Sequence, residues 1–144
     1  MRWRALPSLL LPVWVAASCG SSDCTELDCD HEAVVTFPAG TVTGPYDLTL
    51  TAGNSSESAR CNDPTAPETN DNPPGLRCDL SGFTLEGHSF ANERTLLVTI
   101  TTVDDGTVVA QDVEVRLEAV EELYPNGEDC DPVCFVRNGQ LLMP

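Results

Sequence analysis

The chain has 144 residues, in which 23 acidic residues outweigh seven arginines and no lysine, so the formal net charge is −16 and the pI is about 4.1. This charge excludes a non-specific nucleic-acid binder, which needs a basic surface to neutralise phosphates. The length suits one domain with a small core, and a hydrophobic content of 41% is typical of a globular chain.

The first residues have the pattern of an export signal. Met1 to Arg4 is short and basic, and the apolar stretch from Ala5 to Ala17 ends in small residues before Cys19. A basic start, an apolar stretch and small residues in this order predict a cleavable signal peptide. Two prolines interrupt the stretch, which is shorter than the roughly 20 residues that cross a bilayer, so we expect no membrane-spanning helix.

The residues Ala16-Ala17-Ser18-Cys19 resemble the lipobox of bacterial lipoproteins, with alanine at the first position where that motif usually has leucine. In that family the cysteine thiol receives a diacylglycerol and becomes the first residue of the mature chain. The resemblance implies a signal peptide over residues 1–18, which is removed, and lipid attachment at Cys19. Gly20 stands where inner-membrane retention in the family often uses aspartate, so the resemblance also implies the outer membrane of a bacterial cell envelope. The alternative is an ordinary secreted protein whose Cys19 joins a disulfide.

The cysteine count agrees with lipid attachment. Seven is an odd number, and if Cys19 carries lipid, an even set of six is left for three disulfides in an oxidising compartment. These predicted structural cysteines are Cys24, Cys29, Cys61, Cys78, Cys130 and Cys134. Six cysteines can pair in many ways, and the sequence alone does not choose between them.

Removal of the signal peptide would leave five arginines against 23 acidic residues. Residues 19–32 would then form a lipidated tether and a cysteine-containing segment, with too few residues before Cys24 to lift the domain far from the bilayer. An anionic surface favours cationic partners or divalent ions. We therefore expect the membrane as partner through the lipid, an unidentified protein or a cationic ligand as a further partner, and no nucleic acid.

Residues 33–144 show the alternation of β-strands. Ala33 to Phe37 is rich in β-branched residues and ends at a Pro-Ala-Gly turn. Between Tyr46 and Thr51 apolar residues alternate with Asp or Thr, which predicts a half-buried strand that the turn from Gly53 to Ser56 closes. Gly82 to Gly87 adds a further short strand.

Residues 53–82 are expected to be rich in loops, because prolines and glycines gather around Cys61 and Cys78. A free loop of this length is unusual in a compact domain. A bridge between the two cysteines would tie the loop down and contribute on the order of 3 kcal/mol through chain entropy. We therefore predict a Cys61–Cys78 disulfide.

The strongest strand signal runs from Thr95 to Val103 and leads into Asp104-Asp105-Gly106. An Asp-Gly turn between apolar runs predicts a hairpin whose return strand begins near Thr107. We expect that strand to continue to Glu118, with residues 119–123 as a short turn. The alternative is a helix with Val113, Leu117 and Val120 on one face.

Six to eight short strands without a long helical repeat predict an all-β fold. The class that fits best is a small immunoglobulin-like β-sandwich, stapled by disulfides, over residues 33–144.

The C-terminal region is dense in turn residues and contains Pro125-Asn126-Gly127-x-x-Cys130-x-Pro132-x-Cys134. Together with an early and a mid-chain pair of cysteines, this motif resembles small outer-membrane lipoproteins of myxobacteria and related bacteria, whose function is not assigned. The resemblance depends mainly on residues 125–134. It implies a fold and a location without implying an activity.

Two cysteines near each end of the domain, at positions 24 and 29 and at positions 130 and 134, could ligate zinc. Their spacings are wider than in most zinc ribbons, so we expect them instead to staple the two termini of a small core. Carboxylates near the same ends supply an alternative calcium site: Asp28, Asp30, Glu32, Glu128, Asp129 and Asp131. None of these runs matches a calcium-binding loop, so we expect no metal and no cofactor.

No catalytic residue is predicted. His31 and His88 are the only histidines, neither lies in a nucleophile motif, and His31 between two acidic residues is expected at the surface. The sequence therefore predicts a non-catalytic, lipid-anchored envelope protein that serves as a structural or interaction module at the outer membrane, with loops for recognition. The alternative is a calcium-dependent adhesion or binding domain that uses the terminal carboxylates.

Overall fold

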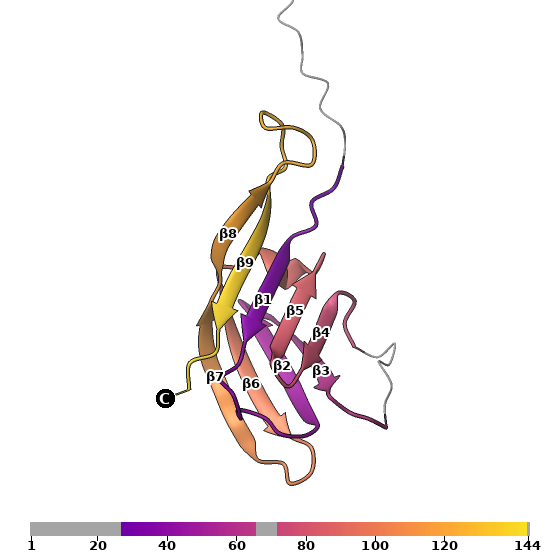
Figure 1. Cartoon of the computed structure of the whole chain (residues 1–144), viewed down its shortest axis with the longest axis vertical. Coiled ribbons are helices and arrows are strands. Elements are labelled where there is room, and N and C mark those ends of the chain that lie inside the picture. The colour runs from indigo at the N-terminus through magenta and orange to yellow at the C-terminus, as the bar shows by residue number, and fades with distance from the viewer. Residues whose placement is uncertain (1–26, 66–71, 144) are drawn as a thin grey trace, which may run out of the picture.

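A computed structural model describes residues 27–65 and 72–143, and nine strands in this part of the chain form two sheets (Figure 1). The five-stranded sheet has the order β4 (Leu76–Asp79), β5 (Gly82–Glu86), β1 (Glu32–Thr36), β9 (Cys134–Gln140) and β8 (Glu118–Leu123). The four-stranded sheet has the order β3 (Ser55–Cys61), β2 (Tyr46–Ala52), β6 (Thr95–Thr102) and β7 (Val108–Arg116). A short 3₁₀ helix, η1 (Ser89–Asn92), precedes β6.

The predicted all-β sandwich is confirmed, with nine strands in place of the expected six to eight. All strand pairs are antiparallel except β1 and β9, which lie parallel, with Ala33 opposite Arg137. This parallel pair places the first strand of the domain beside the last one. The two ends of the described chain are thereby tied into the same sheet.

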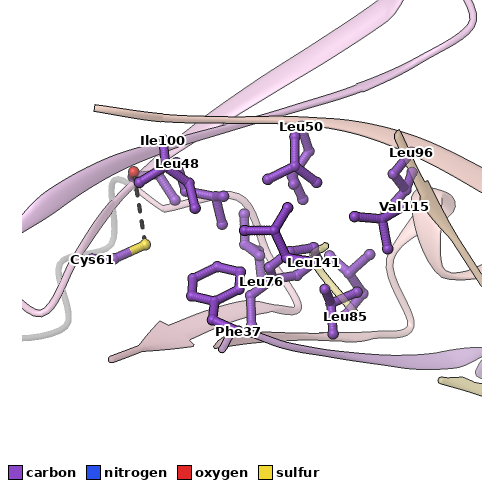
Figure 2. Packing of buried hydrophobic residues seen from close by; sticks show 14 of the residues in the cluster. Phe37, Leu48, Leu50, Cys61, Leu76, Leu85, Leu96, Ile100, Val115 and Leu141 are labelled. Atoms are coloured by element: carbon purple, nitrogen blue, oxygen red, sulfur yellow. Dashed lines mark hydrogen bonds between the residues drawn. The ribbon is translucent and has the colours of Figure 1, made fainter. Parts of the chain in front are cut away.

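The core lies between the sheets and follows the alternation of the strands (Figure 2). Leu48 and Leu50 of β2 are fully buried, as the alternation in the sequence predicted, and so are Leu96 and Ile100 of β6. From the other sheet, side chains of β1, β4 and β5 and of the residue after β9 meet them, including Val35, Leu76, Leu85 and Leu141. Because this apolar contact extends over both sheets, it is the main force that holds them together.

The predicted hairpin at Asp104-Asp105-Gly106 is confirmed between β6 and β7. The carboxylate of Asp105 accepts hydrogen bonds from the Thr102 hydroxyl and from the backbone N–H of Thr107, the latter at 3.0 Å. These bonds stabilise the ionised form and lower the pKa of Asp105 to about 2. Gly106 has φ +68°, a conformation that glycine adopts without strain.

The loop-rich region predicted over residues 53–82 is partly wrong, because β3, β4 and the start of β5 lie within it. The strand β3 escaped prediction because it is an edge strand whose first residues are polar and exposed, and only Ala59 and Cys61 of it are buried. The turn that joins β2 to β3 is therefore tighter than expected, with Ala52 opposite Ser55.

The short turn or helix expected after Glu118 is also wrong. The chain leaves the four-stranded sheet after Arg116, crosses at the buried Leu117 and continues as β8 at the edge of the other sheet. The backbone N–H of Leu117 donates to the carbonyl of Arg94 at 2.8 Å, which fixes the crossing point. Every residue of β8 is exposed, so the strand has no hydrophobic alternation by which it could be recognised.

Candidate functional site at the clamped end of the sandwich

A disulfide joins the chain just before β1 to the first residue of β9. Cys29 and Cys134 are bonded, with their Cα atoms 5.3 Å apart and 105 positions apart in sequence. Cys130 is disulfide-bonded as well. The expectations for Cys19 and Cys24 lie outside the described residues, as does the signal peptide.

The asparagine of the C-terminal motif holds the same two segments together. The Asn126 side chain is buried, its Oδ1 accepts from the backbone N–H of Leu27 at 2.9 Å, and its Nδ2 donates to the carbonyl of Leu27 at 3.1 Å and to that of Asp131 at 3.0 Å. The Asn126 amide therefore bonds to both backbone polar groups of Leu27, as a neighbouring strand would. It also bonds to Asp131 within the loop that contains Asn126 itself. We call Leu27, Cys29, Asn126 and Cys134 the terminal clamp. The sequence motif contained this asparagine but gave no sign of its partners.

His31 lies against the clamp, where it is partly exposed and also makes structural contacts that the sequence did not predict. Its ring stacks on Phe135 with centroids 5.9 Å apart, and its Nδ1 accepts from the backbone N–H of Phe135 at 3.1 Å. Burial and the positive charge of Arg137 lower the pKa of His31. The neutral ring is therefore favoured, in the tautomer that leaves Nδ1 free to accept.

His88 also has a structural role. It is buried, and its Nδ1 accepts from the backbone N–H of Phe90, which caps η1. Its Nε2 lies 2.7 Å from the Glu57 carboxylate of β3, so the side chain joins η1 to the four-stranded sheet. Both ring nitrogens are engaged, as expected for a buried polar group.

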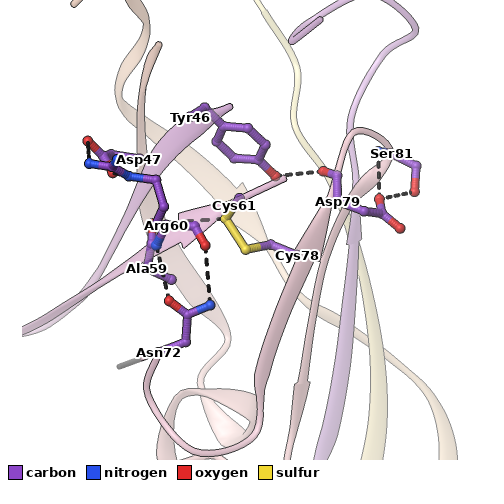
Figure 3. The surroundings of a disulfide bond; sticks show 9 residues. All are labelled: Tyr46, Asp47, Ala59, Arg60, Cys61, Asn72, Cys78, Asp79 and Ser81. Atoms are coloured by element: carbon purple, nitrogen blue, oxygen red, sulfur yellow. Dashed lines mark hydrogen bonds and ion pairs between the residues drawn. A yellow bond between two sulfur atoms is a disulfide. The ribbon is translucent and has the colours of Figure 1, made fainter. Parts of the chain in front are cut away.

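A second staple joins the edge strands of the two sheets (Figure 3). The predicted Cys61–Cys78 disulfide is confirmed, and it links β3 to β4. Close by, the Tyr46 hydroxyl donates to the carbonyl of Asp79 at 2.6 Å, which adds a hydrogen bond between the sheets. Burial and the nearby Asp79 raise the pKa of Tyr46, so the hydroxyl keeps its proton.

The described part of the segment between β3 and β4 is fastened to β3. The amide of Asn72 makes two hydrogen bonds with the backbone of Arg60, accepting at 3.1 Å and donating at 3.2 Å. Arg60 in turn pairs with Asp47 at 2.5 Å. A groove of about 530 Å³ lies beside this staple, lined by residues that include Asp63, Pro74 and Arg77.

The metal alternatives find no support in the described ranges. No group of three or more His, Cys, Asp or Glu residues there is placed to hold a metal ion. The zinc alternative is wrong for Cys29 and Cys134, because their sulfur atoms are bonded to each other. Among the described residues, the terminal carboxylates are not gathered into a group of three or more that could hold a metal ion.

Comparison with protein-family models, with curated proteins and with solved structures finds no match to this chain. No helix in residues 27–65 and 72–143 is long and apolar enough to cross a membrane. The fold and the disulfides therefore define the class directly: a small, acidic β-sandwich in which, among the described residues, one disulfide joins the terminal segments, a second joins the edge strands, and Cys130 is disulfide-bonded as well.

Proposed function

We propose that this chain is an exported, non-catalytic module that is anchored by lipid at Cys19 and acts through binding at a bacterial outer membrane. The observation that carries the proposal is the state of the cysteines. All five that the structure describes are disulfide-bonded: Cys29, Cys61, Cys78, Cys130 and Cys134. Disulfides of this density are typical of exported domains. Since the chain has seven cysteines, one is left without an intramolecular partner, and Cys19 in its lipobox-like context is the one that lipid would occupy.

The position of the clamp supports an anchor at this end. Leu27, which the clamp holds, is eight residues after Cys19, a distance of at most about 28 Å even in a fully extended chain. The domain would thus stay near the bilayer with the loop between β8 and β9 directed toward it. Figure 1 shows this loop beside the segment that enters β1. The Cys29–Cys134 disulfide and the hydrogen bonds of Asn126 to Leu27 would keep the first strand of a domain anchored so closely from being pulled out of its sheet.

A binding role is supported by the use of the polar side chains. Both histidines serve in structural contacts: His31 accepts a hydrogen bond from the backbone of β9, and His88 caps η1. Recognition is then left to surface segments between the strands, which vary without disturbing the core. The groove beside Cys61–Cys78 offers one such surface.

Anchoring is tested by detergent phase partition of envelope fractions from a bacterial host that expresses the full chain. Wild-type protein is expected in the detergent phase, and Cys19→Ser in the aqueous phase with its disulfides intact. Ser21→Ala is the matched control and should partition like the wild type. Equal partition of the wild type and Cys19→Ser would overturn the proposed anchor.

A further inference from the structure

The arginines of the domain divide into two groups. Three are ion-paired: Arg60 with Asp47, Arg77 with Glu86 and Arg116 with Glu114. The other two that the structure describes, Arg94 and Arg137, form no ion pair with any described residue, although the chain has 23 acidic residues. Both line the same cavity.

Arg137 is a buried cation. Its residue is only 7% exposed, and its Nε finds no hydrogen-bond partner in the described structure. Its guanidinium carbon lies 4.8 Å from the centre of the Phe135 ring, a cation–π contact that offsets part of the lost hydration. Burial of a guanidinium without a carboxylate or equivalent acceptor is unfavourable, so a site that retains it is suited to an acceptor from outside the chain.

The strand register explains why Arg137 points inward. It lies opposite Ala33 of β1, which is fully buried, and two residues before Gly139, where an added Cβ would lie 2.8 Å from Val115. Successive side chains of a strand alternate between faces, so Arg137 shares the inner face with Phe135 and Gly139. The chain therefore places a positive charge on the face of the sheet that elsewhere forms the core.

The cavity is a hollow open to solvent that has the size of a small-ligand site. Its volume is about 720 Å³, within the usual range of roughly 300–1,000 Å³ for ligand pockets. Leu117, Ala119 and Phe135 supply apolar walls, and Arg94 approaches from the connection between η1 and β6. Asn92, Glu118 and Glu122 complete the lining, so two arginines and two glutamates border the cavity.

We propose that this cavity binds a carboxylate group on a small ligand with an apolar body. A guanidinium matches the planar carboxylate through two parallel N–H···O bonds, and Arg137 has donors to give. The apolar body would lie against Phe135 and Leu117. The two glutamates repel every anion, and because the repulsion grows with the ligand's charge they disfavour a phosphate dianion more strongly than a monocarboxylate. The site is independent of the lipid anchor and could take a free carboxylic acid or the carboxyl end of a peptide.

The test uses the purified, oxidised protein labelled with ¹⁵N, in which the Nε–Hε signal of Arg137 reports the site directly. N-acetyl-leucine supplies a carboxylate with an apolar body, N-acetyl-leucinamide is its uncharged counterpart, and inorganic phosphate is the dianion. We expect saturable shifts of Arg137 and of the signals around the cavity with N-acetyl-leucine alone. A tripeptide that ends in leucine is compared with N-acetyl-leucine. Tighter binding of the tripeptide indicates a peptide terminus as ligand, and tighter binding of N-acetyl-leucine indicates a small free acid.

Two variants decide the role of the arginines. Arg94 is exposed, so the Arg94→Gln variant should fold normally. The Arg137→Gln variant removes the buried charge. Each is expected to weaken binding of N-acetyl-leucine about tenfold, the effect of one lost charge-assisted contact. Arg77→Gln, at an exposed and ion-paired site, is the control and should bind like the wild type. Shifts of equal size with the amide, no saturation at millimolar acid, or unchanged binding by Arg94→Gln would each overturn the proposal.

Discussion

The amide side chain of Asn126 forms hydrogen bonds with both backbone polar groups of Leu27, a residue 99 positions earlier in the chain. This pairing lies next to the Cys29–Cys134 disulfide, so a covalent and a hydrogen-bonded link hold the same two segments. The contact gives the Pro-Asn-Gly part of the terminal motif a physical reason. Gly127 follows at φ +110°, a backbone conformation that glycine adopts without strain.

Replacement of Asn126 by alanine should destabilise the domain by about 1–3 kcal/mol, because the buried polar groups of Leu27 and Asp131 lose their partner. Urea unfolding monitored by circular dichroism measures this change. Asn138→Ala, at an exposed position of β9, is the matched control, with an expected change within about 0.5 kcal/mol. Equal stability of the two variants would contradict the role given to Asn126.

Removal of the edge staple should cost on the order of 3 kcal/mol. The double variant Cys61→Ala with Cys78→Ala opens a loop closed over 17 positions, and the unfolded chain gains the corresponding entropy. Thermal unfolding under oxidising conditions checks the loss. Leu80→Ala, an exposed residue close to Cys78, should leave the melting temperature nearly unchanged. A double variant as stable as Leu80→Ala would show that the staple does not constrain the unfolded state.

A methyl group at Gly139 should be poorly tolerated. An added Cβ would lie 2.8 Å from Val115 Cγ1 and 2.9 Å from Leu117 Cδ2, so Gly139→Ala should cost about 1–3 kcal/mol through overpacking where the chain crosses between sheets. Gly53→Asn, in a turn with open space around it, is the control and should be close to neutral. Chemical denaturation of both variants compares them, and a neutral Gly139→Ala would mean that β9 does not pack against the crossing as described.

Tyr46→Phe should weaken the domain by about 1 kcal/mol near pH 8, since the Asp79 carbonyl loses its donor. The pKa of Tyr46 is raised in the folded state, so its contribution is fully present below the unfolded pKa of about 10 and is lost as pH rises toward the folded value. The stability gap between wild type and Tyr46→Phe should therefore narrow above pH 10. Urea unfolding at a series of pH values from 8 upward measures this difference in stability. A difference that widens above pH 10 would contradict the buried, hydrogen-bonded environment of Tyr46. Tyr124→Phe, at an exposed position, should be near neutral at pH 8.

The sequence predicted those elements whose burial follows a simple alternation. Tyr46, Leu48 and Leu50 all face the core, and the Asp-Gly turn forms its hairpin, because local residue chemistry decides both. The strands β3 and β8 were missed for a shared reason. Both lie at sheet edges, where hydrogen bonds to one neighbour suffice and buried side chains are few, so their residues show little or no apolar period.

The candidate sites depend on contacts that no local pattern encodes. An arginine within a strand is ordinarily expected on the solvent face, and Arg137 is buried only because β9 pairs in parallel with β1, more than 100 residues away. The role of Asn126 likewise depends on Leu27 reaching it across the domain. The Cys61–Cys78 pair could be predicted because its residues enclose a short, loop-rich segment, whereas the terminal cysteines left several pairings open.

The most direct test of the lipid anchor and the three disulfides is the intact mass of the protein extracted from bacterial membranes, measured with alkylation before and after reduction. We expect a mass equal to residues 19–144 plus acyl groups, with six cysteines that alkylate only after reduction. A lipid-free mass together with cysteines that react before reduction would contradict both the anchor and the exported, disulfide-stapled domain.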